Sequence, residues 1–172
     1  MEQKYRIGIL KFILLLRMEK LTEKFTALFK SLCDEDVEYV LTGDFAIVLH
    51  GALRFTGDID LFIRNSEENL VRLRTALNNV FADESIAEIT VTELKSYAVI
   101  RYGTPDDFFI DIISNIGEKF SFEDLIFQEI DFNGIKIKLA SPDTLYKMKE
   151  RTFRAVDQDD LLFLRDKIRN KK

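Results

Sequence analysis

The segment that decides the fold reads LTGDFAIVLHGALRFTGDIDLFI and runs from Leu41 to Ile63. The apolar residues Val37–Leu41 predict a short strand that ends near Gly43. Residues Phe45–Leu49 then predict a helix, and Gly51 is expected to terminate it. A second strand pattern follows at once, so the segment predicts a strand, a helix and a strand that succeed one another closely.

Two aspartates lie on one face of the second strand pattern. The run Asp58–Ile63, DIDLFI, alternates as a half-buried strand does, and its apolar residues bury the opposite face. This alternation brings Asp58 and Asp60 out on the same face, about 7 Å apart. A later strand pattern, Phe108–Ile113, carries Asp111. If the two strands pair, Asp111 lies beside the first two aspartates.

Such a cluster of three carboxylates favours a metal site. Neighbouring carboxylates repel one another and raise each other's pKa, and a divalent cation removes that repulsion. The chain has a single cysteine, Cys33, and a single histidine, His50, which excludes an internal disulfide and a Cys- or His-rich metal centre. Oxygen ligands favour Mg²⁺ or Mn²⁺. An isolated Asp-x-Asp pair is common on solvent-facing strands, but the turn at Gly43, whose N–H groups could face a phosphate, makes the pattern more specific.

The rest of the chain alternates helix and strand patterns. Residues 21–32 carry an amphipathic helical pattern, and residues 97–102 and 108–113 predict two strands joined by a turn. The residues that predict helix starts and turns are, in order, the helix cap Ser66, the turns Gly103-Thr104-Pro105-Asp106 and Asn133-Gly134, and the helix starts Ser141-Pro142 and Asp157. This order predicts an α+β fold, a mixed sheet flanked by helices, with a C-terminal helical segment.

Composition is typical of one folded domain. The chain has 172 residues, of which 47% are hydrophobic and 32% charged, and its 15 phenylalanines predict an aromatic core. We expect a single domain over residues 1–172, made of N-terminal helices (1–34), a mixed-sheet core (37–139) and C-terminal helices (141–170). The net charge of -5 argues against a general nucleic-acid coat. Cys33 is expected to be a buried small side chain at a helix end.

The N-terminal apolar stretch Ile7–Leu16 is too short to span a bilayer, which needs about 20 residues. It has no small-residue cleavage site, so it does not resemble a signal peptide. We expect a helix that packs on the core or on a partner subunit, and no membrane association. A translation start at Met18 is an alternative. The protein is expected to be cytoplasmic.

The run Thr42–Gly51, followed by Arg54, Thr56, Asp58 and Asp60, resembles the polymerase-β-like nucleotidyltransferase superfamily. More narrowly, it looks like the small bacterial and archaeal nucleotidyltransferases related to abortive-infection toxins of toxin–antitoxin pairs. The pattern of that family is a hydrophobic residue, Gly, then Gly or Ser, later Asp-x-Asp, and a third Asp on a later strand. Asp111 matches the third position. The resemblance runs from about Val37 to Leu164.

The resemblance implies an enzyme that transfers a nucleoside monophosphate from a nucleoside triphosphate to an acceptor hydroxyl on a tRNA end, a protein or a small molecule. Asp58, Asp60 and Asp111 are then the catalytic residues and the ligands of Mg²⁺ or Mn²⁺. The tail around Ala140–Asp143 resembles the closing helical segment of the family, where a Lys and an Arg face the triphosphate. The implied nucleotide-binding residues are Gly43, Asp44, Arg54, Thr56, Lys149 and Arg154. An antitoxin or a second copy of the chain is an implied partner.

One residue departs from the family pattern. Asp44 stands where Gly or Ser is expected, and a carboxylate at that position would repel a triphosphate by about 1–4 kcal/mol at 4 Å. The alternative function is therefore a catalytically weak or inactive nucleotide-binding or partner-binding module of the same fold. A phosphatase or glycosyltransferase that uses Asp-x-Asp is a third interpretation, but Phe62 stands where such a phosphatase would have Thr or Val.

Several candidate residues also have an ordinary structural interpretation. His50 is expected to be a packed residue at a helix end. Arg54 fits a surface salt bridge as well as a phosphate contact, and Lys149 fits a solvated helix charge. Asp157 and Asp160 are expected to be capping and first-turn acids of the final helix.

Overall fold

The computed structural model of the chain describes residues 19–117, 120–150 and 155–170. Its centre is a six-stranded sheet in the order β3-β4-β2-β1-β6-β5. The strands are β1 (Tyr39–Thr42), β2 (Ile59–Ile63), β3 (Val99–Gly103), β4 (Phe109–Ile113), β5 (Phe127–Phe132) and β6 (Ile135–Ala140). The neighbours β1/β6 and β2/β4 run parallel, whereas β1/β2, β3/β4 and β5/β6 run antiparallel. The mixed sheet expected from the sequence is confirmed.

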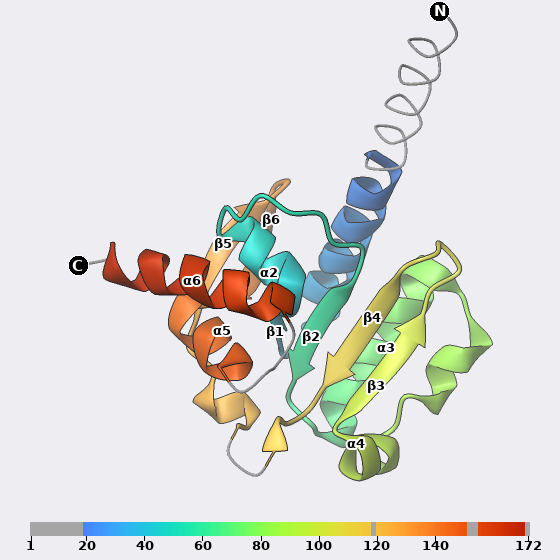
Figure 1. The fold of residues 1–172 in the computed structure, drawn as a ribbon. Coiled ribbons are helices and arrows are strands. Elements are labelled where there is room, and N and C mark those ends of the chain that lie inside the picture. The colour runs from blue at the N-terminus through green and yellow to red at the C-terminus, as the bar shows by residue number, and fades with distance from the viewer. Residues whose placement is uncertain (1–18, 118–119, 151–154, 171–172) are drawn as a thin grey trace, which may run out of the picture.

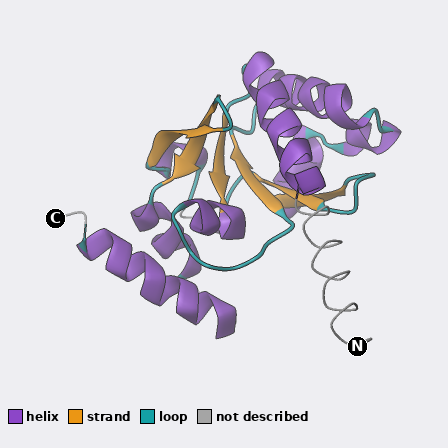
Figure 2. Cartoon of the chain, turned by 90° about the horizontal axis from the view of Figure 1, so that it is seen from above, coloured by secondary structure: helices purple, strands orange, loops and turns teal. Residues whose placement is uncertain are grey.

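Helices lie on both sides of this sheet (Figures 1 and 2). A helix over residues 19–34 precedes the sheet, and α3 lies behind β3 and β4 in Figure 1, whereas α5 and α6 lie together on the other side. The helix bounds are α2 (Gly43–Leu49), α3 (Glu67–Phe81), α4 (Val91–Tyr97), α5 (Pro142–Lys149) and α6 (Ala155–Arg169), with 3₁₀ turns at Glu84–Glu88 and Phe122–Asp124. The fold is α+β, as predicted.

Phenylalanine side chains join the helices to the sheet. Phe25 and Phe29, on the helix over residues 19–34, contact Phe45 of α2 with ring centroids 4.9 and 6.3 Å apart. Phe29 also meets Phe132 of β5 edge-on at 5.3 Å. Burial of such rings contributes most of the packing energy of a core of this size. The cluster holds α2 in place, and α2 begins at Gly43.

The predicted turn at Asn133-Gly134 and the predicted helix starts at Ser66 and Ser141-Pro142 are confirmed. Phe132 pairs with Ile135 across Asn133 and Gly134, which both take positive φ angles of 52° and 82°. The side-chain oxygen of Ser66 accepts a hydrogen bond from the backbone of Asn69 at the start of α3. Ser141 caps α5 in the same way, with Pro142 at the first helical position.

Three local expectations were wrong. Tyr97 was expected to begin a strand, but it ends α4, and the left-handed Ala98 (φ 46°) separates that helix from β3. Asp157 was expected to cap the final helix, but α6 begins at Ala155 and Asp157 lies in its first turn, where its carboxylate accepts a hydrogen bond from Lys149 of α5. Cys33 is exposed rather than buried.

The apolar stretch Ile7–Leu16, the alternative start at Met18 and the predicted site residue Arg154 lie outside the described residues. Within the described residues, no helix is both long enough and apolar enough to cross a membrane.

Candidate functional site

A cavity of about 220 Å³ lies between the open face of β2 and β4 and the helix α5. It is lined mainly by polar and acidic side chains near β2, by the start of α2 and by α5. The lining residues are Thr42, Gly43, Asp44, Thr56, Asp58, Asp60, Arg101, Asp111, Ile113, Ile116, Leu145, Met148 and Lys149. Seven of the nine residues that the sequence pointed to therefore line this single cavity.

Strand register brings the aspartates of the cavity together. The parallel pair β2/β4 sets Asp60 opposite Asp111, and the antiparallel pair β1/β2 sets Thr42 opposite Asp60. Asp58 lies directly before β2, where its backbone N–H donates a hydrogen bond to the hydroxyl of Thr56 (3.4 Å). The carboxylates thus come from two segments about 50 residues apart in the chain.

The backbone of Gly43 lies directly against the carboxylate of Asp60. Gly43 has a φ angle of +65°, and a Cβ atom added there would overlap the carboxylate of Asp60. Only glycine combines this left-handed conformation with such a close approach. The glycine of the sequence pattern therefore has a local physical cause: it makes room for the second aspartate of Asp-x-Asp.

The surroundings of Asp60 disfavour the ionised form of its carboxyl group. Burial raises the pKa of Asp60 most, the carboxylates of Asp111, Asp44 and Asp58 raise it further, and the Lys149 ammonium lowers it, so that the pKa is about 7. A half-buried carboxylate surrounded by other carboxylates fits a divalent cation, which would supply the missing positive charge. The donors of Asp58, Asp60 and Asp111 are all oxygens, the ligand type of Mg²⁺ or Mn²⁺, although these three carboxylates are not among the acids whose oxygens gather within 4.8 Å of one another in the described residues.

Sequence reasoning missed Arg101, which reaches into this cavity from β3. Its Nε donates to Oδ1 of Asp111 (2.8 Å) and its NH2 group donates to Oδ2 (2.6 Å). These hydrogen bonds raise the pKa of Arg101, as does the charge of Asp111. The pairing follows from the β3/β4 register, which sets Arg101 opposite Asp111. The turn at residues 103–106 was predicted. Counting the cross-strand residue pairs outward from that turn could have indicated that Arg101 lies opposite Asp111.

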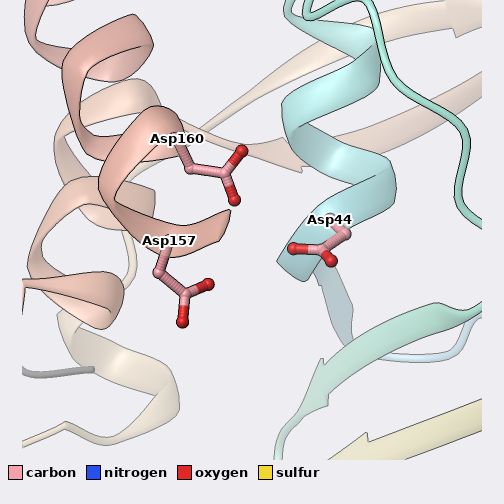
Figure 3. A group of neighbouring side chains, drawn as sticks. All are labelled: Asp44, Asp157 and Asp160. Atoms are coloured by element: carbon pink, nitrogen blue, oxygen red, sulfur yellow. The ribbon is translucent and has the colours of Figure 1, made fainter. Parts of the chain in front are cut away.

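A second group of acids adjoins the cavity. Carboxylate oxygens of Asp44, Asp157 and Asp160 lie within 4.8 Å of one another, and Figure 3 shows them reaching toward a common space from α2 and α6. This spacing alone would suit a metal ion. However, Nζ of Lys149 lies 2.7 Å from Asp44, 2.7 Å from Asp157 and 2.8 Å from Asp160. A lysine ammonium already provides the cation there, which makes this group the poorer candidate for a metal.

Arg54 completes this ionic network. Its NH1 group donates to both carboxylate oxygens of Asp160 (2.6 and 2.7 Å), and its NH2 group pairs with Asp44. Of the two open interpretations of Arg54, the structure shows the salt bridge. Burial by itself lowers the pKa of Lys149, but its hydrogen bonds to the three aspartates outweigh burial, so the pKa is raised.

Two expectations change with this network. Lys149 is only 7% exposed and Asp157 is fully buried, so neither is a solvated helix charge. Asp44, expected to repel a triphosphate, has its carboxylate paired with Lys149 and Arg54. The carboxylate of Asp44 is therefore ion-paired inside the protein, although its charge still contributes to the raised pKa of Asp60. His50 is a packed residue at the end of α2, as expected, with Nε2 2.8 Å from the carbonyl oxygen of Ala140.

Comparisons with known proteins show the family and the fold of the chain. Residues 21–172 match the family described as nucleotidyl transferase of unknown function (DUF2204), and the chain belongs to this family. A solved structure with a similar fold is an antigenic nucleotidyltransferase-like protein from Paracoccidioides brasiliensis. It shares 17% sequence identity with a TM-score of 0.53, over 85% of this chain and 75% of that chain, which shows a common fold. A comparison with curated proteins found no match to this sequence.

Proposed function

We propose that the protein is a metal-dependent nucleotidyltransferase that transfers a nucleoside monophosphate from a nucleoside triphosphate to an acceptor hydroxyl. The observation that carries the proposal is the strand register that sets Asp60 beside Asp111, with Asp58 in the same cavity. In a chain of a nucleotidyl transferase family, this group of carboxylates is the natural place for the chemistry.

In this proposal Asp58 and Asp60 hold Mg²⁺ or Mn²⁺ together with the triphosphate, and Asp111 lies on the acceptor side. The metal, when bound, stabilises the negative charge that develops on the phosphate oxygens. Asp60 needs a cation to remain ionised near neutral pH, because its pKa is about 7. Gly43 and Thr56 line the cavity beside these acids and leave room for the phosphates.

The reaction is an in-line displacement at the α-phosphorus. The acceptor oxygen forms a bond to that phosphorus while the bond to the bridging oxygen breaks, and pyrophosphate leaves. The proton of the acceptor hydroxyl passes to a carboxylate oxygen of Asp111, which acts as the general base. Lys149 and Arg54 are bound to aspartates, so they act by fixing α5 and α6 beside the cavity.

The first test measures thermal unfolding with each nucleoside triphosphate, with and without Mn²⁺ or Mg²⁺. Nucleotide at tenfold its Kd should raise the melting temperature by about 3–5 °C, only with metal, and Asp60→Asn should abolish the rise. The matched control is Asp34→Asn, which removes an exposed ion pair with Lys30 far from the cavity. Release of pyrophosphate from α-³²P-labelled nucleotide, with label on an acceptor, completes the test. An equal temperature rise in Asp60→Asn would contradict the proposal.

A second candidate function is a nucleotide-binding or partner-binding module with weak or no catalysis. The observation that favours it is the guanidinium of Arg101, which engages both oxygens of Asp111. Nucleotide binding without pyrophosphate release, for any of a tRNA, protein or small-molecule acceptor, would select this alternative.

The resemblance to abortive-infection toxins adds a proposal about the biological role, in which a cognate antitoxin restrains the enzyme. Expression of the wild-type chain should then arrest growth, and Asp58→Asn should relieve the arrest. Arrest that persists in the variant would exclude nucleotide transfer as its cause.

A further inference from the structure

Asp111 differs from the other two acids of the cavity in having its own cation. Both of its oxygens accept hydrogen bonds from Arg101, at 2.8 and 2.6 Å. Among the described residues, no cation forms an ion pair with Asp58 or Asp60. A divalent ion on Asp111 would need the same oxygen atoms that the guanidinium holds, so a metal and Arg101 compete for this carboxylate.

The ion pair between Arg101 and Asp111 is open to solvent on the arginine side. The side chain of Asp111 is 13% exposed, whereas that of Arg101 is 57% exposed on the edge strand β3. Solvent access on the arginine side weakens this ion pair relative to a buried one, whereas its bidentate geometry strengthens it, so Arg101 holds Asp111 but can exchange with solvent. The guanidinium also lies over the ring of Phe109, 5.2 Å from its centroid. This ring lies on the same open face of β4 as Asp111. It gives the guanidinium a second contact, through cation–π attraction, when a metal binds Asp111.

The charge of the cavity sets the order of events. Asp58 and Asp60 form no direct ion pair among the described residues, so a metal that arrives with a nucleotide displaces no bound cation there, although Lys149 lies near Asp60 and Arg101 near both acids. At Asp111 the same metal must displace Arg101 and overcome repulsion by the guanidinium. With a metal and a triphosphate bound at Asp58 and Asp60, the negative phosphates would offset the repulsion by Arg101, and Asp111 could then contribute its oxygens to a second cation.

We propose that Arg101 is a positioning residue that holds Asp111 until a metal–nucleotide complex occupies Asp58 and Asp60. The two metal positions therefore fill in order: the first with the nucleotide, and the second after Arg101 leaves Asp111. The protein without nucleotide is thus kept from binding a metal pair and from activating a hydroxyl. This inference rests on the proposed function.

The test is Mn²⁺ binding, measured by electron paramagnetic resonance and calorimetry on the full chain with an α,β-methylene nucleoside triphosphate. We expect one tighter and one weaker Mn²⁺ in the wild type. Arg101→Gln should tighten the weaker Mn²⁺ by about three- to tenfold, because it removes both the competition and the repulsion, and should change the tighter one less, because Arg101 acts on Asp58 and Asp60 only through its charge. Arg101→Lys should fall between, since an ammonium has no bidentate fork.

Controls separate the two proposals. Arg72→Gln removes an arginine that pairs with Glu68 on α3, away from the cavity, and should leave both affinities unchanged. A weaker Mn²⁺ whose Kd in Arg101→Gln stays within about twofold of wild type, with an unchanged thermal unfolding profile, would overturn this inference alone. No nucleotide-dependent Mn²⁺ binding in the wild type would overturn the proposed function, and this inference with it.

Discussion

The carboxylate of Asp60 packs against the backbone of Gly43, so closely that no side chain fits on the glycine. The contact joins the end of β1 to the polar face of β2. It explains why the glycine and the Asp-x-Asp pair occur together in this sequence, although 16 residues lie between Gly43 and Asp60. The glycine also turns the chain into α2, where Asp44 follows.

Gly43→Ala is expected to damage both stability and metal binding. The new methyl group would overlap Asp60, and the residue would be held at a φ of +65°, which together should cost about 2–4 kcal/mol in the free energy of unfolding. Urea unfolding and Mn²⁺ titration measure the two effects. Gly117→Ala is the matched control, because Gly117 has a similar φ of +62° but open space at the Cβ position. Equal losses in the two variants would show that backbone strain, and not Asp60, sets the requirement for glycine.

Asp60 should make the metal-free protein less stable as the pH rises. Its folded pKa is about 7, whereas an unfolded Asp titrates near 3.9, so between these values the folded state holds the extra proton. Stability therefore falls as the pH rises from about 4 to 7, and the full loss persists above pH 7. Asp60→Asn should remove this slope and raise the free energy of unfolding at pH 8 by about 1–2 kcal/mol. Denaturant unfolding from pH 4 to 8 measures it.

Saturating Mn²⁺ provides the control for this pH dependence. Bound metal should flatten the slope in the wild type and have no effect on Asp60→Asn, since the metal favours the ionised carboxylate. Wild-type and variant profiles that run parallel without metal would mean that the Asp60 carboxylate is well solvated.

The sequence predicted the parts of the site that lie within one strand or one turn. Alternation in Asp58–Ile63 fixed which face carries the aspartates, and the structure confirms a strand there. The contact between Asp60 and Asp111 needed the further condition that β2 and β4 pair, which alternation does not contain. Arg101 was missed for the same reason, because an arginine on an edge strand has the pattern of an ordinary solvated charge until the register sets it opposite Asp111.

The network around Lys149 was beyond sequence reasoning. Lys149 lies on α5, while Asp157 and Asp160 lie on α6, and the sequence contains no periodicity that joins two separate helices. Asp44 is 105 residues away from Lys149. The sequence predicted Lys149 and Asp44 beside a nucleotide. It predicted Asp157 and Asp160 as capping and first-turn acids, and it therefore joined none of these residues in one ionic network. The burial that identifies them comes from the packing of α5 and α6 beside α2.

Lys149→Met should destabilise the fold strongly. It would leave Asp157, fully buried, and Asp160 without their shared ammonium, and breaking a buried ion pair on one side costs about 3–5 kcal/mol. Urea unfolding measures the loss. Lys147→Met is the matched control, because Lys147 is exposed on the same helix, and its loss should stay within about 0.5 kcal/mol. Unchanged stability with weaker nucleotide binding would mean that the ammonium contacts phosphate instead of holding the helices.

Asp44→Asn tests whether this carboxylate repels the nucleotide or serves the fold. Its oxygens pair with Lys149 and Arg54, so the variant should lose about 1–3 kcal/mol of unfolding free energy. Nucleotide affinity, measured by calorimetry with Mn²⁺, should stay within about threefold, because the ion pairs of Asp44 with Lys149 and Arg54 reduce its repulsion of a triphosphate.

The opposite result would restore the expectation from the sequence. Unneutralised repulsion of about 1–4 kcal/mol would make Asp44→Asn bind nucleotide about five- to a thousandfold more tightly, with little change in stability. Asp143→Asn, on the first turn of α5, is the control, since it removes one negative charge from a residue that does not line the cavity. Tighter binding in both variants would reflect the net charge of the protein, whereas tighter binding in Asp44→Asn alone would locate the repulsion at the start of α2.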